Sequence, residues 1–133
     1  MKIKWWHRIS NSEVLQRAKS TTIETMLPGN CLRWLGHVSR MKDDRIPKQL
    51  LFGELARGTR DRGRHRKRWK DCAKDNLKSF NIDYNSWYSQ TQDRARWQQN
   101  VREGKAFSEQ QLFSRAERRR QKQHEVRAPL CQN

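Results

Sequence analysis

The chain of 133 residues carries 30 Lys and Arg against 14 Asp and Glu, so its formal net charge is +16 and its isoelectric point lies near 10.8. This length holds one small domain, or one domain and a tail. Such a charge imbalance is typical of proteins that bind a polyanion, and it favours nucleic acid over an anionic membrane, an acidic protein or a charged surface with no partner.

Two features of the composition oppose each other. Leu, Ile, Val and Phe number 23 of 133, which is below the level of about 20% that is associated with disorder. Six Trp residues offset this shortage, since each buries on the order of 150–250 Å². We therefore expect a small, marginally stable helical core built around Trp.

The sequence also indicates a cellular compartment. No apolar run reaches the length of a signal-peptide core or of a membrane span, and the three Cys are too far apart to imply a disulfide framework. We expect an intracellular protein without a membrane partner, in the nucleus rather than the cytoplasm.

The first half of the chain shows helical periodicity. A short helix is predicted over residues 11–18. Residues 21–41 form a second helical segment with Trp34 beside its apolar stripe, which consists of Leu32, Leu35, Val38 and Met41. The Pro28-Gly29 pair within this segment is expected to break or sharply kink the helix. Residues 42–47 read as a turn, and residues 48–55 fit a helix turn or a buried strand equally well.

The second half continues the pattern. A helix over residues 66–80 places one apolar face on Trp69, Cys72, Ala73, Leu77 and Phe80. Another helix is predicted to begin at Asp83 or Asn85, to carry Trp87 and Trp97, and to end at Gly104. Within it, Asp93-Arg94 is interpreted as an ion-pairing motif that ties helices together. A last helix spans about 107–126 and begins with a capping-box spacing at Ser108. Beyond Ala116 this helix is polar all round, so it should project into solvent or onto a partner.

Together these elements predict a mainly α fold, a small open bundle of about four to five helices with a flexible basic arm and a projecting charged C-terminal helix. The helical domain is predicted to span residues 1–104 and the charged helix with a frayed tail residues 105–133. The predicted core consists of Trp34, Leu35, Val38, Trp69, Leu77, Trp87 and Trp97.

The basic arm is the strongest functional signal. Residues 57–70 contain eight Lys or Arg and one Asp, and Gly58 and Gly63 give this stretch backbone freedom. Phosphates would neutralise this charge. The predicted nucleic-acid-binding residues are Arg57, Arg60, Arg62, Arg64, Arg66, Lys67, Arg68 and Lys70.

Catalytic patterns are missing from the sequence. Cys31 and His37 form the only close pair of metal-ligand types, with no second pair at zinc-finger distance. Cys72 lies on an apolar face, and no phosphate-binding Gly-x-x-x-x-Gly-Lys loop occurs. We therefore predict no enzyme activity, no metal site and no cofactor.

Several motifs occur in a specific order. They are LRWLGHVSRM at residues 32–41, DRIPKQLLFGEL at 44–55, GRHRKRWKD at 63–71, DNLK at 75–78, and Trp87 followed by DRARW at 93–97. This succession resembles the C-terminal region of non-LTR (LINE-type, RTE-like) retrotransposon polyproteins, downstream of the reverse transcriptase. The resemblance covers nearly all of residues 5–120.

The resemblance implies a detached piece of a larger protein. The endonuclease domain and the polymerase domain with its Tyr-x-Asp-Asp motif have no counterpart in this sequence. What the family implies is a role in gripping template RNA or target DNA, with the reverse transcriptase or another protein as a further possible partner through exposed Trp surface. A structural or protein-interaction remnant, even one without a selected function, is the alternative. Pro28-Gly29 and His65 depart from the family pattern.

Overall fold

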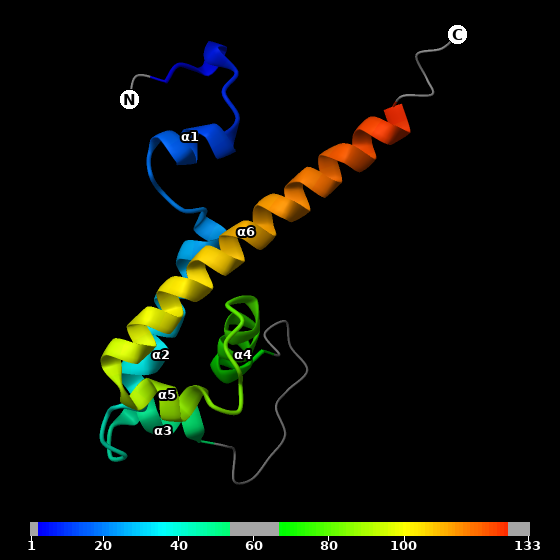
Figure 1. Cartoon of the computed structure of the whole chain (residues 1–133). Coiled ribbons are helices and arrows are strands. Elements are labelled where there is room, and N and C mark those ends of the chain that lie inside the picture. The colour runs from blue at the N-terminus through cyan, green and yellow to red at the C-terminus, as the bar shows by residue number, and fades with distance from the viewer. Residues whose placement is uncertain (1–2, 54–66, 128–133) are drawn as a thin grey trace.

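The computed structural model describes residues 3–53 and 67–127, and these ranges contain helices and no strand. A short 3-10 turn precedes six α-helices (Figure 1), which are α1 (Asn11–Arg17), α2 (Ile23–Ser39), α3 (Ile46–Phe52), α4 (Trp69–Ser79), α5 (Trp87–Gln92) and α6 (Arg94–Arg127). The predicted all-helical class is confirmed. The segment over 48–55, which the sequence left open between helix and strand, is helical over residues 48–52 as part of α3, and its residues 54 and 55 lie outside the described ranges.

Helix α2 lies at the centre of the packing and contacts α3, α4, α5 and α6. The core collects apolar side chains from each of these helices and from the loop after α4. Its buried residues are Leu32, Leu35, Val38, Leu51, Ala73, Leu77, Phe80, Ile82, Trp87, Trp97 and Val101. The far half of α6 extends away from α2–α5 (Figure 1), so the long charged helix projects as the sequence predicted.

Trp97 makes a close contact between α2 and α6. Its side chain is 1% exposed, and its indole Nε1–H donates to the backbone oxygen of Leu32 at 3.0 Å. The ring lies where a Cβ on Gly36 would be, so glycine is required at that position. The hydrogen bond satisfies the indole N–H, which would otherwise be costly to bury.

The break predicted at Pro28-Gly29 does not occur, because α2 runs through both residues. Pro28 is the sixth residue of the helix and removes one backbone donor from its second turn. Burial of Leu32, Leu35 and Val38 in the core, where α2 contacts α3, α4, α5 and α6, outweighs this loss. Gly29 is buried and faces the side chain of Lys105 on α6, so it permits close helix packing rather than ending a helix.

The predicted helix boundaries in the second half are also wrong. The chain breaks at Asp93 instead of Gly104, so α5 is short and α6 is continuous across residues 104 and 105. The Asp93 carboxylate accepts from the backbone N–H groups of Ala95 and Arg96 at 2.9 and 3.2 Å, which makes it the cap of α6 and not the predicted ion-pair partner. Gly104 lies inside α6, where Phe80 packs against it. A Cβ added to Gly104 would lie 2.7 Å from the Cβ of Phe80, so this position has no room for a side chain.

The predicted capping box at Ser108 is absent too, because Ser108 is buried inside α6. The neighbouring Glu109 instead caps α2. Its carboxylate accepts from the Thr22 backbone N–H at 3.0 Å and from the Thr22 hydroxyl at 2.9 Å. A carboxylate at this end of α2 also complements the helix dipole.

Substituting the two buried glycines of α2 should have opposite effects. Gly36→Ala forces a methyl group into the Trp97 indole and should lower the free energy of unfolding by about 1–3 kcal/mol. Gly29→Ala meets only the far end of the flexible Lys105 side chain, so it should leave stability unchanged or raise it by up to about 1 kcal/mol. Urea unfolding followed by circular dichroism measures both, and equal effects would contradict the proposed packing.

The capping by Glu109 should make stability depend on pH. Burial raises the pKa of Glu109, but the hydrogen bonds from Thr25 and Thr22, with help from the nearby Lys105 charge, outweigh it, and the net shift is downward. The stabilisation is therefore complete above the usual glutamate range and is lost as the pH falls through the lowered pKa.

Glu109→Gln should lower the free energy of unfolding at neutral pH by about 0.5–1 kcal/mol and flatten its dependence on pH in the acid range. Glu103→Gln is the matched control, because Glu103 is an exposed residue of the same helix and, within the described ranges, accepts a hydrogen bond from Gln99 alone. Identical acid unfolding curves for the wild type and Glu109→Gln would exclude this role.

Candidate nucleic-acid interface

Three of the predicted phosphate-binding residues are described by the structure. Lys67 and Arg68 directly precede α4, and Lys70 lies in its first turn. The other predicted residues lie outside the described ranges, namely Arg57, Arg60, Arg62, Arg64 and Arg66. The C-terminal end of the basic arm is thus fixed at the start of α4.

Two carboxylates of α4 bind the residues at this end of the arm. The Arg68 backbone N–H donates to Asp71 Oδ2 at 2.9 Å, which secures the start of the helix. Lys67 Nζ pairs with Asp75 Oδ2 at 2.6 Å, and both side chains are exposed. The hydrogen bond and the charge of this pair raise the pKa of Lys67 and lower the pKa of Asp75. Lys67 therefore stays protonated at any physiological pH.

Beside these cations lies a pair of Trp rings from two helices. Trp34 of α2 and Trp69 of α4 contact each other edge to face, with ring centroids 4.7 Å apart and planes at 81°. Both were predicted to be core residues, and that prediction is wrong, because Trp34 is 46% and Trp69 37% exposed.

The position of each Trp on its helix explains this exposure. Leu32 and Leu35 of α2 face the core, and Trp34 lies to the side of that stripe. Trp69 is the first residue of α4. The buried residues of this helix are Ala73 and Leu77, one and two turns further along the same face. The pair thus lies at the solvent edge of the α2–α4 contact. The other predicted core residues are buried, namely Leu35, Val38, Leu77, Trp87 and Trp97.

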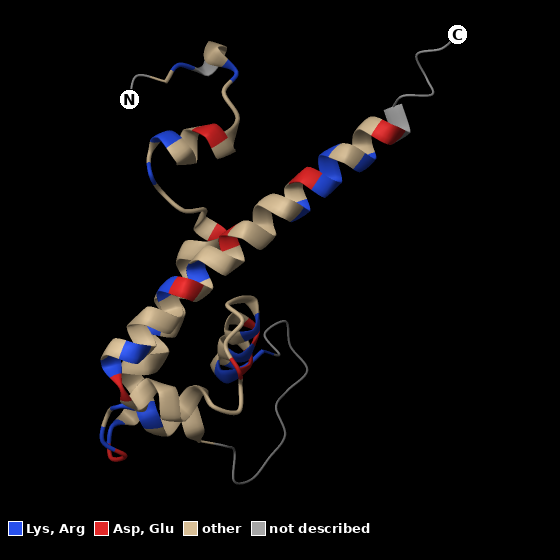
Figure 2. Cartoon of the chain, viewed as in Figure 1, with Lys and Arg blue, Asp and Glu red and all other residues tan. Residues whose placement is uncertain are grey.

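Further Lys residues lie on α4, and Lys and Arg residues recur along the far half of α6 (Figure 2). On α4, Lys74 Nζ lies 4.7 Å from the centroid of the Tyr84 ring, a cation–π contact that holds one charge in place. The far half of α6 exposes Arg115, Arg118, Arg119, Arg120 and Lys122 against Glu117 and Glu125. The described surface is therefore basic in two places, next to the Trp pair and along the projecting helix.

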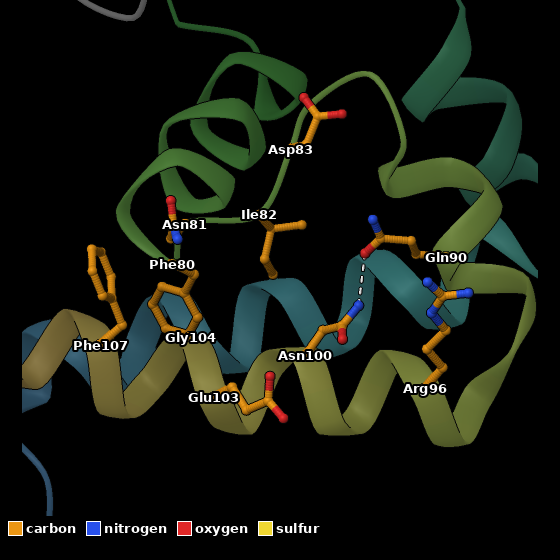
Figure 3. Close-up of a pocket in the computed structure, with 10 residues that line it drawn as sticks. All are labelled: Phe80, Asn81, Ile82, Asp83, Gln90, Arg96, Asn100, Glu103, Gly104 and Phe107. Carbon is orange, nitrogen blue, oxygen red and sulfur yellow. Dashed lines mark hydrogen bonds between the residues drawn. The ribbon is translucent and has the colours of Figure 1, made fainter.

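An open cleft of about 410 Å³ separates the loop after α4 from α6 (Figure 3). Its polar side chains largely bond to protein groups. Asn100 donates to Gln90 Oε1 at 2.7 Å, and backbone and side-chain hydrogen bonds from Asn85 and Ser86 lower the pKa of Asp83. Asp83 and Glu103 lie on opposite sides of the opening (Figure 3) and do not form a carboxylate pair. The cleft thus lacks paired catalytic carboxylates and holds no His, Cys, Ser or Thr.

Other catalytic groups do not assemble in the described part of the chain. No three His, Cys, Asp or Glu residues gather there as metal ligands would. Burial raises the pKa of the Cys31 thiol, although a hydrogen bond with Asn76 partly opposes this shift. A thiol with a raised pKa is a weak nucleophile at neutral pH.

No described helix combines the length and apolar character that crossing a membrane requires. Comparison with known proteins yields no matching family model, no matching curated protein and no matching solved structure. The functional argument therefore depends on the residues and their geometry.

The basic arm was evident from the sequence, but the Trp pair next to it was not. Its signal was present in two places. Trp34 falls one residue away from the apolar stripe of its helix, and Trp69 directly adjoins the densest run of positive charge. What the sequence did not reveal is that α2 and α4 bring these two positions together.

Proposed function

We propose that this chain is a non-catalytic basic module that binds nucleic acid, RNA or DNA, through phosphate contacts and with little sequence preference. The observation that carries the proposal is the net charge of +16 together with exposed cations at the start of α4, Lys67 and Arg68, and five exposed Lys and Arg between residues 115 and 122 of α6. Replacing the counterions of a polyanion by such side chains releases them into solution and drives association.

The arrangement of the charges supports phosphate binding over a purely structural role. Among the described residues, the side chains from Arg115 to Lys122 make no ion pair with a carboxylate, so their charges remain available. Lys67, by contrast, is held by Asp75 at the end of the arm, which fixes one charge beside the Trp pair.

Origin and location form part of the same proposal. The ordered motifs that resemble the C-terminal region of non-LTR retrotransposon polyproteins suggest a module that once held template RNA or target DNA for a reverse transcriptase. Such a role places the protein inside the cell, in the nucleus rather than the cytoplasm.

Affinity should fall steeply with salt. Contacts to about 6–8 phosphates predict a slope of about −5 to −7 in a plot of log affinity against log salt concentration for duplex DNA. Fluorescence anisotropy with labelled RNA and DNA of unrelated sequences measures this slope. Absence of binding at low salt, or a flat salt dependence, would overturn the proposal.

Removing the charges of the arm should weaken binding to every sequence by about the same factor. A variant with Arg64, Arg66, Lys67 and Arg68 replaced by Ala should reduce the salt slope by about 3–4, because each phosphate contact contributes about 0.9. The matched control replaces four exposed cations elsewhere, namely Lys42, Arg45, Arg94 and Arg102. Equal losses for the two variants would show that net charge, and not the arm, determines affinity.

A second candidate function is a protein-docking piece of a polymerase. A broad groove between α1 and α6, lined by Val14, Leu15, Ile23, Leu112 and Phe113, favours it. Ile23 and Leu27 of α2 are also mostly exposed. Binding of a hydrophobic dye and concentration-dependent association, in a chain with no affinity for nucleic acid, would support this candidate.

A further inference from the structure

The Trp34–Trp69 pair is unusual because this chain is able to bury Trp. Trp97 and Trp87 lie in the core, yet Trp34 and Trp69 keep 46% and 37% of their surfaces in solvent. In a chain so poor in aliphatic residues, leaving two indoles at the surface sacrifices a large apolar area. The exposed pair therefore has the character of a binding surface.

The pair is held in a fixed geometry by two helices. Trp34 lies in the middle of the long helix α2, and Trp69 begins α4, whose start is secured by Asp71. The two rings meet edge to face, and each still keeps more than a third of its surface in solvent. A planar ligand could stack there without any rearrangement of the backbone.

The immediate surroundings of the pair are cationic. Arg33 precedes Trp34 and is exposed, Lys67 is exposed two residues before Trp69, and Lys70 follows Trp69. The nearby carboxylates of Asp71 and Asp75 are engaged by the Arg68 backbone and by Lys67. A purely apolar partner would desolvate the charges of Arg33 and Lys70, which make no ion pair with a carboxylate among the described residues. A nucleotide presents a planar base and an anionic phosphate together, which matches both features.

Building on the proposed binding of nucleic acid, we propose that Trp34 and Trp69 form a base-stacking site that makes this chain prefer single-stranded nucleic acid to duplex. Bases in a duplex already stack on their neighbours, so only a single strand offers free base faces to an indole. Stacking on aromatic side chains is tolerant of sequence, because every base has a flat face.

The experiment compares the full-length chain with its Trp34→Ala and Trp69→Ala variants on three ligands of equal length. The ligands are a mixed-sequence single strand, its duplex, and a strand in which abasic sites replace the bases at the same phosphates. Each substitution should weaken single-strand binding by about 5- to 150-fold and change duplex binding by less than about twofold. The wild type should lose at least this factor on the abasic strand, and each variant should distinguish the abasic from the intact strand less than the wild type does.

Two further variants serve as controls. Trp6→Ala removes an indole that is 55% exposed but lies outside the α2–α4 contact, and it should leave all three affinities unchanged. Trp34→Phe keeps an aromatic face at the site and should retain most of the single-strand affinity. Circular dichroism establishes that each variant retains the helical content of the wild type.

The outcomes separate this site from the proposed function. Equal losses on single strand and duplex, or no loss on either, would overturn the stacking site while leaving phosphate binding intact. Loss of self-association or of protein binding with unchanged single-strand affinity would identify the pair as a protein-docking surface and would also overturn it. A wild type that binds none of the three ligands at low salt would overturn the proposed function itself.

Discussion

The packing of Trp97 against α2 is the contact on which the rest of the fold depends. The core combines small and medium aliphatic side chains with Phe80, Trp87 and Trp97, and Trp97 is the largest side chain that is fully buried. Its ring takes the space that a side chain at Gly36 would fill, and its N–H bonds to the backbone of Leu32. This contact fixes α6 along α2, and α3, α4 and α5 pack on the same central helix.

Helical periodicity predicts the apolar faces of this fold, but the sequence does not predict the structural role of its glycines. The apolar stripes of α2 and α4 follow from helical periodicity, because the spacing of Leu32, Leu35 and Val38 leaves one consistent face. Gly29 and Gly104 looked like helix breakers by their local preference, yet both lie inside helices, where a neighbour occupies the space of a Cβ. Local chemistry cannot distinguish a glycine that ends a helix from one that admits a side chain, since the difference lies in a residue far along the chain.

The same limit applies to the acidic residues and to the candidate interface. Asp93 and Glu109 each cap a helix, but Glu109 caps α2 from 87 residues away, which no local pattern reveals. The basic arm was evident because charge density is a property of the sequence itself. The exposure of Trp34 and Trp69 was not, because a Trp near an apolar stripe is buried only if enough helices surround it. Here α2 and α4 meet with their outer edge open to solvent.

Charge and stability are connected in this molecule. Like charges along the far half of α6 repel one another, and a helix without an apolar face gains little from packing. The far half of α6 is held to the bundle at one end only, and an isolated helix of such composition is marginal in water. A polyanion that binds the folded chain neutralises the repulsion and stabilises the fold by mass action. If the chain binds nucleic acid as proposed, the positive charges that lower the stability of the free chain are therefore the same charges that stabilise its complex.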